Sequence, residues 1–266
     1  QGMLTDITDL KNAQLQLEKY IEELKRSNRN LEEFAYAASH DLKEPVRKIH
    51  FFGERLRTSL ADKLSDEEKR YFERMQIASL RMSTLIDDLL TYSEVGQRPR
   101  TFEKVDMNQL IAQVLSDLDL EIEQKSATIR VDNLFTINGH HRQLQQAFLN
   151  LVANALKYNK PGTPPVITIA CRKVSGKEVN AYLTAEEQLQ SFYCIVVSDN
   201  GIGFDQADAE RIFNVFTRLH GMAEYKGTGI GLSIVRKVIL NHGGHIKAES
   251  EPGKGAAFYV YLPEKS

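Results

Sequence analysis

A seven-residue repeat of apolar positions runs through residues 7–49 and restricts the folds open to this chain. One series consists of Leu10, Leu17, Leu24, Leu31 and Ala38, and the other, three residues ahead of it, of Ile7, Gln14, Ile21, Asn28, Ala35, Leu42 and Ile49. This is the a/d spacing of a coiled coil. It predicts a long helix paired with a second copy of itself. The alternative is a single amphipathic helix packed on a domain, which the unbroken register disfavours.

Three residues in this segment carry information beyond the repeat. Asn28 occupies an a position, where a polar side chain fixes the register and favours two strands. His40 falls at the outward f position, beside Asp41 at g. An imidazole acts as nucleophile or base near neutral pH, and an adjacent carboxylate orients it or takes its proton. The alternative is that the two side chains are simply solvated residues on a helix surface, which is common for a His-Asp pair.

Pro45 follows His40 by five residues and predicts a kink there, because proline donates no backbone N–H. The alternative is that the helix bends for packing reasons alone and that the position of His40 near the bend has no functional meaning. After the kink, residues 65–68 (Ser-Asp-Glu-Glu) form a capping box that predicts a new helix. Its apolar stripe consists of Phe72, Met75, Met82, Leu85, Ile86, Leu89 and Leu90. We expect this helix to pair antiparallel with the His40 helix, so that two chains build a four-helix bundle.

The composition limits the classes of protein to which this chain can belong. The 266 residues suffice for one large domain or two smaller ones, and the 42% hydrophobic content predicts a packed core. A net charge of −2 gives no general attraction to nucleic acid or anionic membrane. No apolar run approaches the ~20 residues that span a bilayer, so we expect a soluble fragment. Cys171 and Cys194 lie in apolar runs without metal-ligand spacing, which predicts buried, reduced thiols.

Residues 96–100 (Gly-Gln-Arg-Pro-Arg) predict a linker, after which the pattern changes. Beyond it we expect helices after a cap at Asp106, at 140–158 and at 230–241, and strands at 128–131, 166–172, 192–198, 245–250 and 257–262. The polar segment 173–190 is a long hairpin or an inserted turn. Helices and strands do not alternate regularly, which predicts a mixed sheet with helices on one face.

The first chemical block of this region is residues 150–158. Asn150 and Asn154 share one helix face, and their amide oxygens suit Mg²⁺. Lys157 can reach a phosphate from the same helix end. The alternative is two surface asparagines and a solvated lysine.

The second and third blocks follow the next strand. Residues 199–204 (Asp-Asn-Gly-Ile-Gly-Phe) place Asp199 where it can accept a hydrogen bond from an adenine amine, and glycines there admit a flat ligand. In isolation this motif is more often a simple turn. Residues 212–216 (Ile-Phe-Asn-Val-Phe) carry aromatics suited to anchoring a mobile segment.

The fourth block, residues 227–232 (Gly-Thr-Gly-Ile-Gly-Leu), opens a helix, where glycine N–H groups and the helix dipole make a phosphate cradle. It is neither a dinucleotide fingerprint nor a P-loop. The polar residues 217–226 before it predict a lid.

With these blocks in this order, nearly the whole chain resembles a sensor histidine kinase of two-component signalling. Residues 39–45 (Ser-His-Asp-Leu-Lys-Glu-Pro) are similar to the phospho-acceptor box, in the form found in phytochrome-like kinases. The four later blocks resemble the N, G1, F and G2 boxes of the catalytic ATP-binding domain, which has the Bergerat fold of Hsp90, gyrase and MutL. Residues 2–9 resemble the closing strand of a PAS sensor domain, which suggests a truncated chain.

The resemblance implies three segments. Residues 1–30 would be a coiled-coil signalling linker, residues 31–97 the dimerisation and histidine phosphotransfer domain, and residues 101–266 the catalytic ATP-binding domain. The implied fold is a helical hairpin forming a dimeric four-helix bundle, followed by an α/β sandwich. The implied setting is cytoplasmic, with a homodimer, a response-regulator receiver domain as partner and an upstream PAS-type sensor. Membrane attachment through other parts of a longer protein stays open.

The resemblance also implies site residues. His40 would attack the γ-phosphorus of ATP, Asp41 would accept or orient its proton, and Asn154 would hold Mg²⁺ with Asn150 close to the metal or its water. The implied nucleotide-binding residues are Asn150, Asn154, Lys157, Tyr158, Asp199, Gly201, Gly203, Arg218, Gly227, Thr228, Gly229, Gly231 and Leu232. The phosphoryl group would then pass to an aspartate of the receiver domain, with catalysis resting on positioning and charge.

One position departs from the common form of the phospho-acceptor box. Four residues after the histidine, that form carries threonine or asparagine, which positions water for dephosphorylating the regulator, but this chain carries Glu44. Phosphatase activity is therefore in doubt. Two other functions are alternatives. A Bergerat ATPase that drives conformational change would lack the His40 helix, and a scaffold with a vestigial site would lack Asn154, Asp199 or the glycines, all of which are present.

Overall fold

The computed structural model describes residues 8–61, 63–95, 101–179, 183–219, 225 and 227–264. The chain folds as two compact units that meet in the sequence between Glu94 and Val95, and each unit is described by itself. Most of the PAS-like segment 2–9, the whole linker 96–100 and residues 220–224 and 226 of the expected lid lie outside the described residues.

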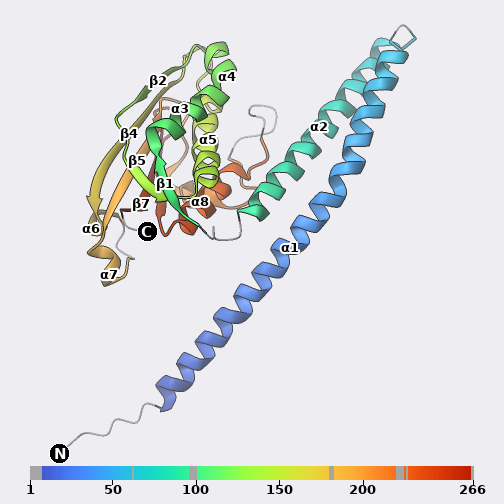
Figure 1. Ribbon diagram of the computed structural model, residues 1–266. Coiled ribbons are helices and arrows are strands. Elements are labelled where there is room, and N and C mark those ends of the chain that lie inside the picture. Colours follow the sequence, from blue (N-terminus) through green and yellow to red (C-terminus); the bar gives the residue numbers. More distant parts are fainter. Residues whose placement is uncertain are drawn as a thin grey trace, which may run out of the picture. The chain divides into compact units, whose positions relative to one another are not determined.

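The first unit is an antiparallel helical hairpin of α1 (Thr8–Ser59) and α2 (Asp66–Glu94), as expected (Figure 1). The capping box before α2 is confirmed, since Ser65 N donates to the Glu68 carboxylate at 2.8 Å and Glu68 N donates to Ser65 Oγ at 3.3 Å. Pro45 lies inside α1 and does not end it. Its missing N–H leaves the carbonyl of Asp41 without its helical donor.

Where α1 contacts α2, along what we call the inner seam of the hairpin, the buried residues of α1 form a heptad series that the a/d pattern did not reveal. Ser39, Val46 and Gly53 occur once per heptad, at e positions, and all three are buried. On α2, Ser79 donates its hydroxyl to the Val46 carbonyl at 3.3 Å. At Gly53 an added Cβ would lie 2.8 Å from Met75 Cε. Small residues on this seam therefore let the two helices approach closely.

The predicted a/d face of α1 stays largely uncovered within one chain. Leu17, Ile21, Leu42 and Ile49 are 60%, 41%, 54% and 48% exposed. On α2, Ile77 and Leu80 are also more than half exposed. A stripe of exposed apolar residues on this scale is unusual for a surface that faces only water.

The second unit is built on a five-stranded sheet of order β2-β4-β5-β7-β6. Its strands are β2 (Thr128–Val131), β4 (Val166–Ser175), β5 (Ser191–Asp199), β6 (His245–Glu251) and β7 (Gly255–Pro263). β2 pairs parallel with β4 and the other pairs are antiparallel, so the sheet is mixed, as predicted.

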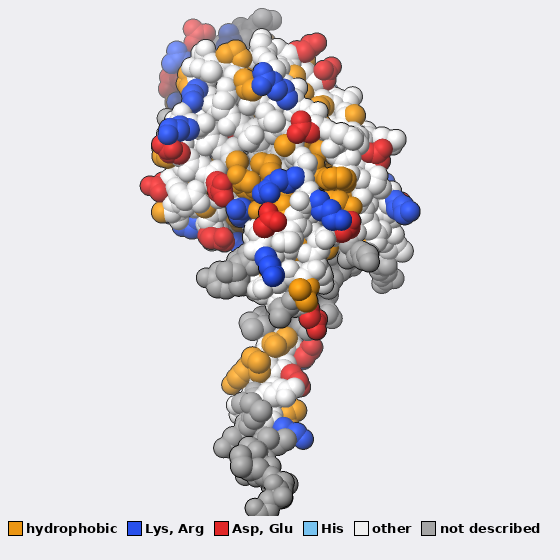
Figure 2. Space-filling view, turned by 90° about the vertical axis from the view of Figure 1, so that its left-hand side faces the viewer, with side chains coloured by type: hydrophobic (Ala, Val, Ile, Leu, Met, Phe, Trp, Pro, Cys, Tyr) orange, Lys and Arg blue, Asp and Glu red, His pale blue; other side chains and the backbone are white. Residues whose placement is uncertain are grey.

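Three helices pack on one face of this sheet: α3 (Met107–Asp117), α5 (His141–Lys157) and α8 (Gly231–Asn241) (Figure 1). Asp106 caps α3 by accepting from Asn108 N at 2.9 Å, as predicted. The core between helices and sheet consists of fully buried side chains such as Leu110, Leu144, Phe148, Leu151, Ile167, Ile195, Val235 and Val260. The other face carries hydrophobic side chains interspersed with charged ones (Figure 2). Lys247 there lies 4.6 Å from the ring centroid of Tyr259.

Several elements were not foreseen. β1 (Glu103–Asp106) pairs antiparallel with β3 (Thr136–Gly139), and a short helix α4 (Asp119–Gln124) follows α3. The η1 (Gln206–Asp208) and η2 (Arg211–Phe213) turns precede the lid segment. The segment 173–190 is the end of a long β4–β5 hairpin that carries α6 (Gly176–Val179) and α7 (Ala185–Gln188). A small separate core beneath them consists of Val174, Val179, Leu183, Phe192, Cys194 and Tyr261.

Both cysteines are free, as predicted. Cys194 is fully buried, whereas Cys171 is only half-buried, and burial raises the pKa of Cys171 to about 11. Within the described ranges, no helix is both long enough and apolar enough to cross a membrane.

Candidate functional site

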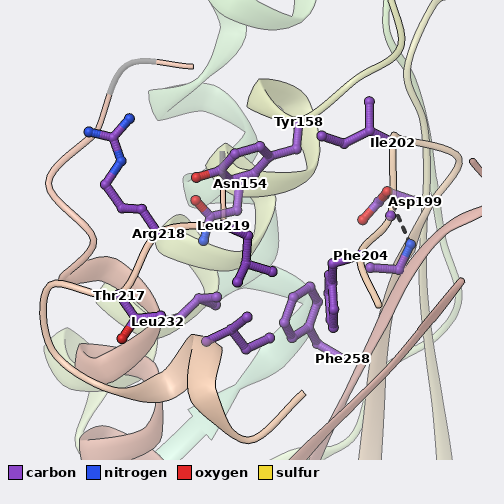
Figure 3. Close-up of a pocket in the computed structure, with 13 residues that line it drawn as sticks. Asn154, Tyr158, Asp199, Ile202, Phe204, Thr217, Arg218, Leu219, Leu232 and Phe258 are labelled. Atoms are coloured by element: carbon purple, nitrogen blue, oxygen red, sulfur yellow. Dashed lines mark hydrogen bonds between the residues drawn. The ribbon is translucent and has the colours of Figure 1, made fainter. Parts of the chain in front are cut away.

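The second unit contains an open pocket, with about 610 Å³ of empty space when the adjoining solvent is included (Figure 3). Its walls come from α5, the end of β5 and the loop after it, η2, the first residues of the lid segment, the start of α8, and β7. The lining residues are Asn154, Tyr158, Asp199, Ile202, Gly203, Phe204, Ile212, Thr217, Arg218, Leu219, Leu232, Ala256 and Phe258. The pocket therefore joins parts of the second, third and fourth sequence blocks with one asparagine and the tyrosine of the first.

Asp199, the last residue of β5, is the main ionisable group in this pocket. Its Oδ1 accepts hydrogen bonds from Gly201 N at 2.8 Å and Ala256 N at 3.3 Å. Burial raises the pKa of the carboxyl group, and these two main-chain hydrogen bonds oppose the shift. Because both bonds use Oδ1, the carboxylate is held in one orientation, with Oδ2 left to accept from a ligand.

The glycines after Asp199 are needed for contacts within the protein. At Gly201 an added Cβ would lie 2.4 Å from the Tyr158 carbonyl oxygen, and at Gly203 it would lie 2.2 Å from that of Glu251. Gly203 also has φ +63°, in the left-handed region. Ile202 N donates to the Tyr158 carbonyl at 2.9 Å. The glycines thus bring this loop against the end of α5 and against β6.

The two asparagines of α5 have different surroundings. Asn154 lines the pocket, and none of the described residues forms a hydrogen bond with its amide. Asn150 instead bridges two helices, because its Nδ2 donates to the Gly231 carbonyl at 3.2 Å and its Oδ1 accepts from Gln146 at 3.4 Å. Only Asn154 is therefore fully available to a ligand.

Lys157 and the glycine block lie next to each other beyond the pocket lining. The Lys157 ammonium donates to the Tyr158 hydroxyl at 3.0 Å. It lies so close to Gly227 that an added Cβ there would be 2.3 Å from Nζ. Gly229 has φ +80°, and Ile230 N donates to Thr228 Oγ1 at 3.4 Å. A positive charge thus borders the start of α8, where main-chain N–H groups are available to an anion.

The described ends of the lid segment are tied to the pocket rim. Arg218 donates to the Tyr225 carbonyl at 2.7 Å. The Tyr225 ring lies 5.1 Å from that of Tyr158, and its hydroxyl donates to the Asn159 carbonyl at 3.3 Å. Arg218 therefore has a protein partner as well as a place in the pocket wall.

Residues 212–216 contain two phenylalanines, Phe213 and Phe216, and only one of them anchors the segment as expected. Phe213 is buried and packs edge-on against Phe258, with ring centroids 6.4 Å apart. Phe216 is 59% exposed and has φ +63°, so it does not anchor the segment as expected. The turn there places its side chain outward.

The apolar walls of the pocket were not identified as site residues from the sequence. They consist of Ile202, Phe204, Ile212, Leu219, Ala256 and Phe258. Ile202 and Phe204 belong to the glycine-containing second block, which was the available signal. Phe258 lies in a strand, where its pattern matches that of any core residue.

In the first unit, His40 is presented to solvent, as its f position predicted. The side chains of His40 and Asp41 are 74% and 86% exposed, and Nδ1 lies 3.4 Å from the Asp41 carboxylate. Two ion pairs follow them along α1: Lys43 pairs with Asp87 of α2 at 2.7 Å, and Glu44 pairs with Lys48 of α1 at 2.7 Å. Within the described part of the chain, no three His, Cys, Asp or Glu residues form a metal cluster.

Two sequence families match this chain, one over each unit. Residues 30–98 match the His Kinase A (phospho-acceptor) domain. Residues 139–266 match the histidine kinase-, DNA gyrase B-, and HSP90-like ATPase family. The first match contains His40, and the second contains every residue that lines the pocket.

Curated relatives match the chain across both units. Phytochrome-like protein Cph1 of Synechocystis sp. is 35% identical over 240 residues, which cover 90% of this chain and 30% of that protein. The methanogenesis regulatory histidine kinase FilI of Methanothrix harundinacea is 31% identical over 264 residues, covering 96% of this chain and 27% of that protein. The chain thus spans about three-tenths of the length of these relatives.

Solved structures share the fold at lower identity. Full-length ShkA in complex with AMPPNP has a TM-score of 0.63 at 22% identity, covering 88% of this chain and 46% of that one. The Acinetobacter baumannii histidine kinase AdeS has a TM-score of 0.56 at 19% identity, covering 85% and 98%. Taken with the two family matches and the curated relatives, the fold and the pocket show that this chain belongs to the sensor histidine kinases.

Proposed function

We propose that this chain phosphorylates its own His40 from ATP and passes the phosphoryl group to an aspartate on a response-regulator receiver domain. One observation carries the proposal: an exposed imidazole with an adjacent carboxylate and a pocket suited to a nucleotide occur in one chain. The match to an ATPase family and the AMPPNP bound to ShkA support ATP as the nucleotide. Catalysis of this kind rests on positioning and charge stabilisation.

In this proposal, the pocket holds the adenine ring. Its exocyclic amine donates to Oδ2 of Asp199, while Gly201 and Ala256 hold Oδ1. The apolar walls, including Phe258, contact the faces of the ring. Tyr158 borders the base or the ribose. The carboxylate is oriented before the ligand arrives, which lowers the entropic cost of binding.

The phosphates then extend toward the start of α8. The Lys157 ammonium and the main-chain N–H groups of Gly229 and Gly231 supply positive charge there, and Thr228 supplies a hydroxyl. Arg218 reaches a phosphate only after releasing the Tyr225 carbonyl, so its contact is coupled to movement of the lid segment.

The donors present at this site fit Mg²⁺. The Asn154 amide is a neutral oxygen donor with no hydrogen-bond partner among the described residues, and it lies on the pocket wall. Mg²⁺ commonly takes one or two protein oxygens and completes its shell with water and substrate phosphates. We therefore assign Asn154 as its ligand. Asn150, whose amide donates to the Gly231 carbonyl, would lie close to the metal or its water. When bound, Mg²⁺ neutralises phosphate charge.

The geometry at His40 favours one ring nitrogen as the nucleophile. In this proposal Nδ1 carries the ring proton and donates it to the ionised Asp41, whose carboxylate lies 3.4 Å away. Nε2 then carries the lone pair that attacks the γ-phosphorus. The new N–P bond forms as the bond from phosphorus to the bridging oxygen breaks, and ADP leaves. Asp41 stabilises the positive charge that develops on the ring.

We also propose that the hairpin dimerises through its a/d face. Leu42, Ile49, Ile77 and Leu80 are each 48% exposed or more, and a second copy would cover them. The e-position seam to α2 and the a/d seam to the partner together give the core of a four-helix bundle. Asn28, whose side chain lies outside the described parts of α1, would fix the register.

The domain plan of the longer protein follows the same reasoning. We propose a signalling linker over residues 1–30, a dimerisation and phosphotransfer domain over 31–97 and a catalytic domain over 101–266. The chain covers about three-tenths of its relatives, which leaves room for an upstream sensor, of PAS type by the resemblance of residues 2–9. The need for ATP and a receiver domain places the reaction in the cytoplasm.

Glu44 argues against a phosphatase function. It stands one turn after His40 and pairs with Lys48 at 2.7 Å, a contact that lowers the pKa of Glu44. The group beside the phosphorylated ring is therefore an anion at neutral pH. An anion repels the acyl phosphate of a regulator and is not the neutral side chain that would position its water.

Labelling with γ-labelled ATP and Mg²⁺ tests the proposed function. The wild type should gain acid-labile, base-stable label, and His40→Gln should gain none. His50→Gln is the matched control, because His50 is an exposed residue of the same helix and should label normally. Undiminished acid-labile label on His40→Gln would show that the acceptor is another residue.

A further inference from the structure

A buried histidine at the C-terminal end of α8 joins two helices. His242 is only 2% exposed. Its Nδ1 lies 2.7 Å from the Val238 carbonyl, which only accepts, so Nδ1 carries the ring proton. Nε2 therefore accepts, and it does so from His140 N at 2.9 Å. Because His140 caps α5, one neutral imidazole connects the end of α8 to the start of α5.

The same end of α8 also holds both sides of the segment 96–100. Asn241, the last residue of α8, donates to the Val95 carbonyl at 2.6 Å. The Phe102 ring stacks on that of His242, with centroids 5.0 Å apart and planes 10° apart. Val95 directly follows α2 in the sequence. We call Val95, Phe102, Asn241 and His242 the linker anchor.

The other end of α8 belongs to the proposed nucleotide site. The helix has 11 residues, so about 16 Å separates its two ends. At its start, Leu232 lines the pocket and Asn150 bonds to the Gly231 carbonyl. The contact between α5 and α8 thus has a polar tie at each end. A helix fixed in this way transmits a displacement of one end to the other with little loss.

We propose that Asn241 and His242 are positioning residues that couple nucleotide binding at the start of α8 to the chain segment that follows α2. Nucleotide in the pocket restrains α8, and the linker anchor passes this restraint to Val95 and to residues 101–106. This inference rests on the proposed nucleotide site and adds to it a route from that site to the connection with the His40 hairpin. Neither residue contacts the pocket.

Hydrogen exchange on the full chain tests the coupling without relying on phosphorylation. The probe is a non-hydrolysable ATP analogue with Mg²⁺, and the readout is exchange in a peptide covering residues 95–106. The analogue should slow this exchange about fivefold in the wild type, the scale of one or two hydrogen bonds. Asn241→Ala should abolish the slowing while the dissociation constant of the analogue changes less than about twofold. Asn133→Ala, an exposed loop residue of the same unit, is the matched control and should retain it.

Changes on the linker side and at the histidine separate coupling from simple stabilisation. Phe102→Leu keeps apolar volume but removes the ring stacking, and it should also abolish the slowing. His242→Gln retains an acceptor for His140 N, so it should keep analogue affinity while losing the response of residues 95–106. His141→Gln, which has no side-chain partner in the described structure, should behave as the wild type.

Two results would overturn the proposal. One is exchange over residues 95–106 that ignores the analogue in the wild type while the analogue binds. The other is a full response in both Asn241→Ala and Phe102→Leu. Failure of the proposed kinase function would appear differently, as an unlabelled His40 in a protein whose exchange still responds to the analogue.

Discussion

The two units bury their apolar residues to very different extents. In the α/β unit, Phe148, Leu151 and Ile195 are completely buried within one chain. In the hairpin, Leu42 and Ile49 remain about half exposed, and the buried seam uses small residues instead. The α/β unit is therefore complete as a folded body, whereas the hairpin has a second apolar face that its own chain does not cover. In the hairpin the side chain of His40 is exposed, whereas the Asp199 carboxylate in the pocket of the α/β unit is buried.

Leu151→Ala should have the largest effect on stability. The leucine is fully buried on α5, so its removal leaves a cavity and should lower the free energy of unfolding of the α/β unit by about 2–5 kcal/mol. Calorimetry on the full chain measures this change, which should not depend on protein concentration. A concentration-dependent midpoint would show that the α/β unit also needs a partner.

Asp199→Asn should weaken nucleotide binding about 100-fold, or nearly 3 kcal/mol. Asparagine can keep the acceptor for Gly201 N and Ala256 N through its oxygen. Its NH₂ group then takes the place of Oδ2, so that two hydrogen-bond donors, this group and the adenine amine, face each other without an acceptor. Titration calorimetry with ATP checks the result, with Asp208→Asn as control because that carboxylate pairs with Arg211. Unchanged affinity would remove Asp199 from adenine recognition.

Leu42→Ala together with Ile49→Ala should raise the dimer dissociation constant by about tenfold or more. Both side chains are half exposed in one chain, so their truncation should barely change the fold of the hairpin itself. Sedimentation equilibrium gives the dissociation constant. Tyr71→Ala, also exposed but on α2 outside the a/d face of α1, provides a comparison. A wild-type monomer at micromolar concentration would contradict the dimer.

The smallest expected effect is a pH dependence that belongs to the α/β unit. Burial lowers the pKa of His242 below its usual value, so the unfolded chain binds a proton more readily. Stability should therefore fall as the pH drops through about 6.5, the value for unfolded histidine, toward the lower folded pKa. His140 faces the ring and adds to the repulsion when charged. Urea unfolding of the wild type at pH 5 and pH 7.5 should show this loss, and His242→Gln should show less of it.

Local signals predicted the elements well where they were strong. Asp106 and Ser65 mark the two helix starts as predicted, and the predicted strand 128–131 coincides with β2. β1 and β3 escaped prediction because each has only four residues with mixed burial and needs its partner to form. The e-position seam was missed because Ser39 and Gly53 carry no hydrophobic signal.

The polar part of the candidate site was largely predictable, whereas most of its apolar wall was not. Asp199, Asn154 and Tyr158 all line the pocket. Their motifs could be recognised in the sequence because polar residues with a chemical role occur at characteristic spacings. Asn150 shares a helix face with Asn154, yet it bonds to α8, and only the packing of α5 on α8 decides this. Outside the glycine-containing block, the apolar wall has no sequence signature of its own, because Phe258 resembles any other buried strand residue.

The far end of the β4–β5 hairpin has a practical consequence. Val179, Leu183 and Phe192 belong to a separate core there, and none of them lines the pocket. Substitutions in this core can therefore alter the far end of the hairpin without changing any residue that lines the pocket. A fluorescent reporter attached at Leu189, which is 82% exposed, would leave both His40 and the pocket in their native sequence context.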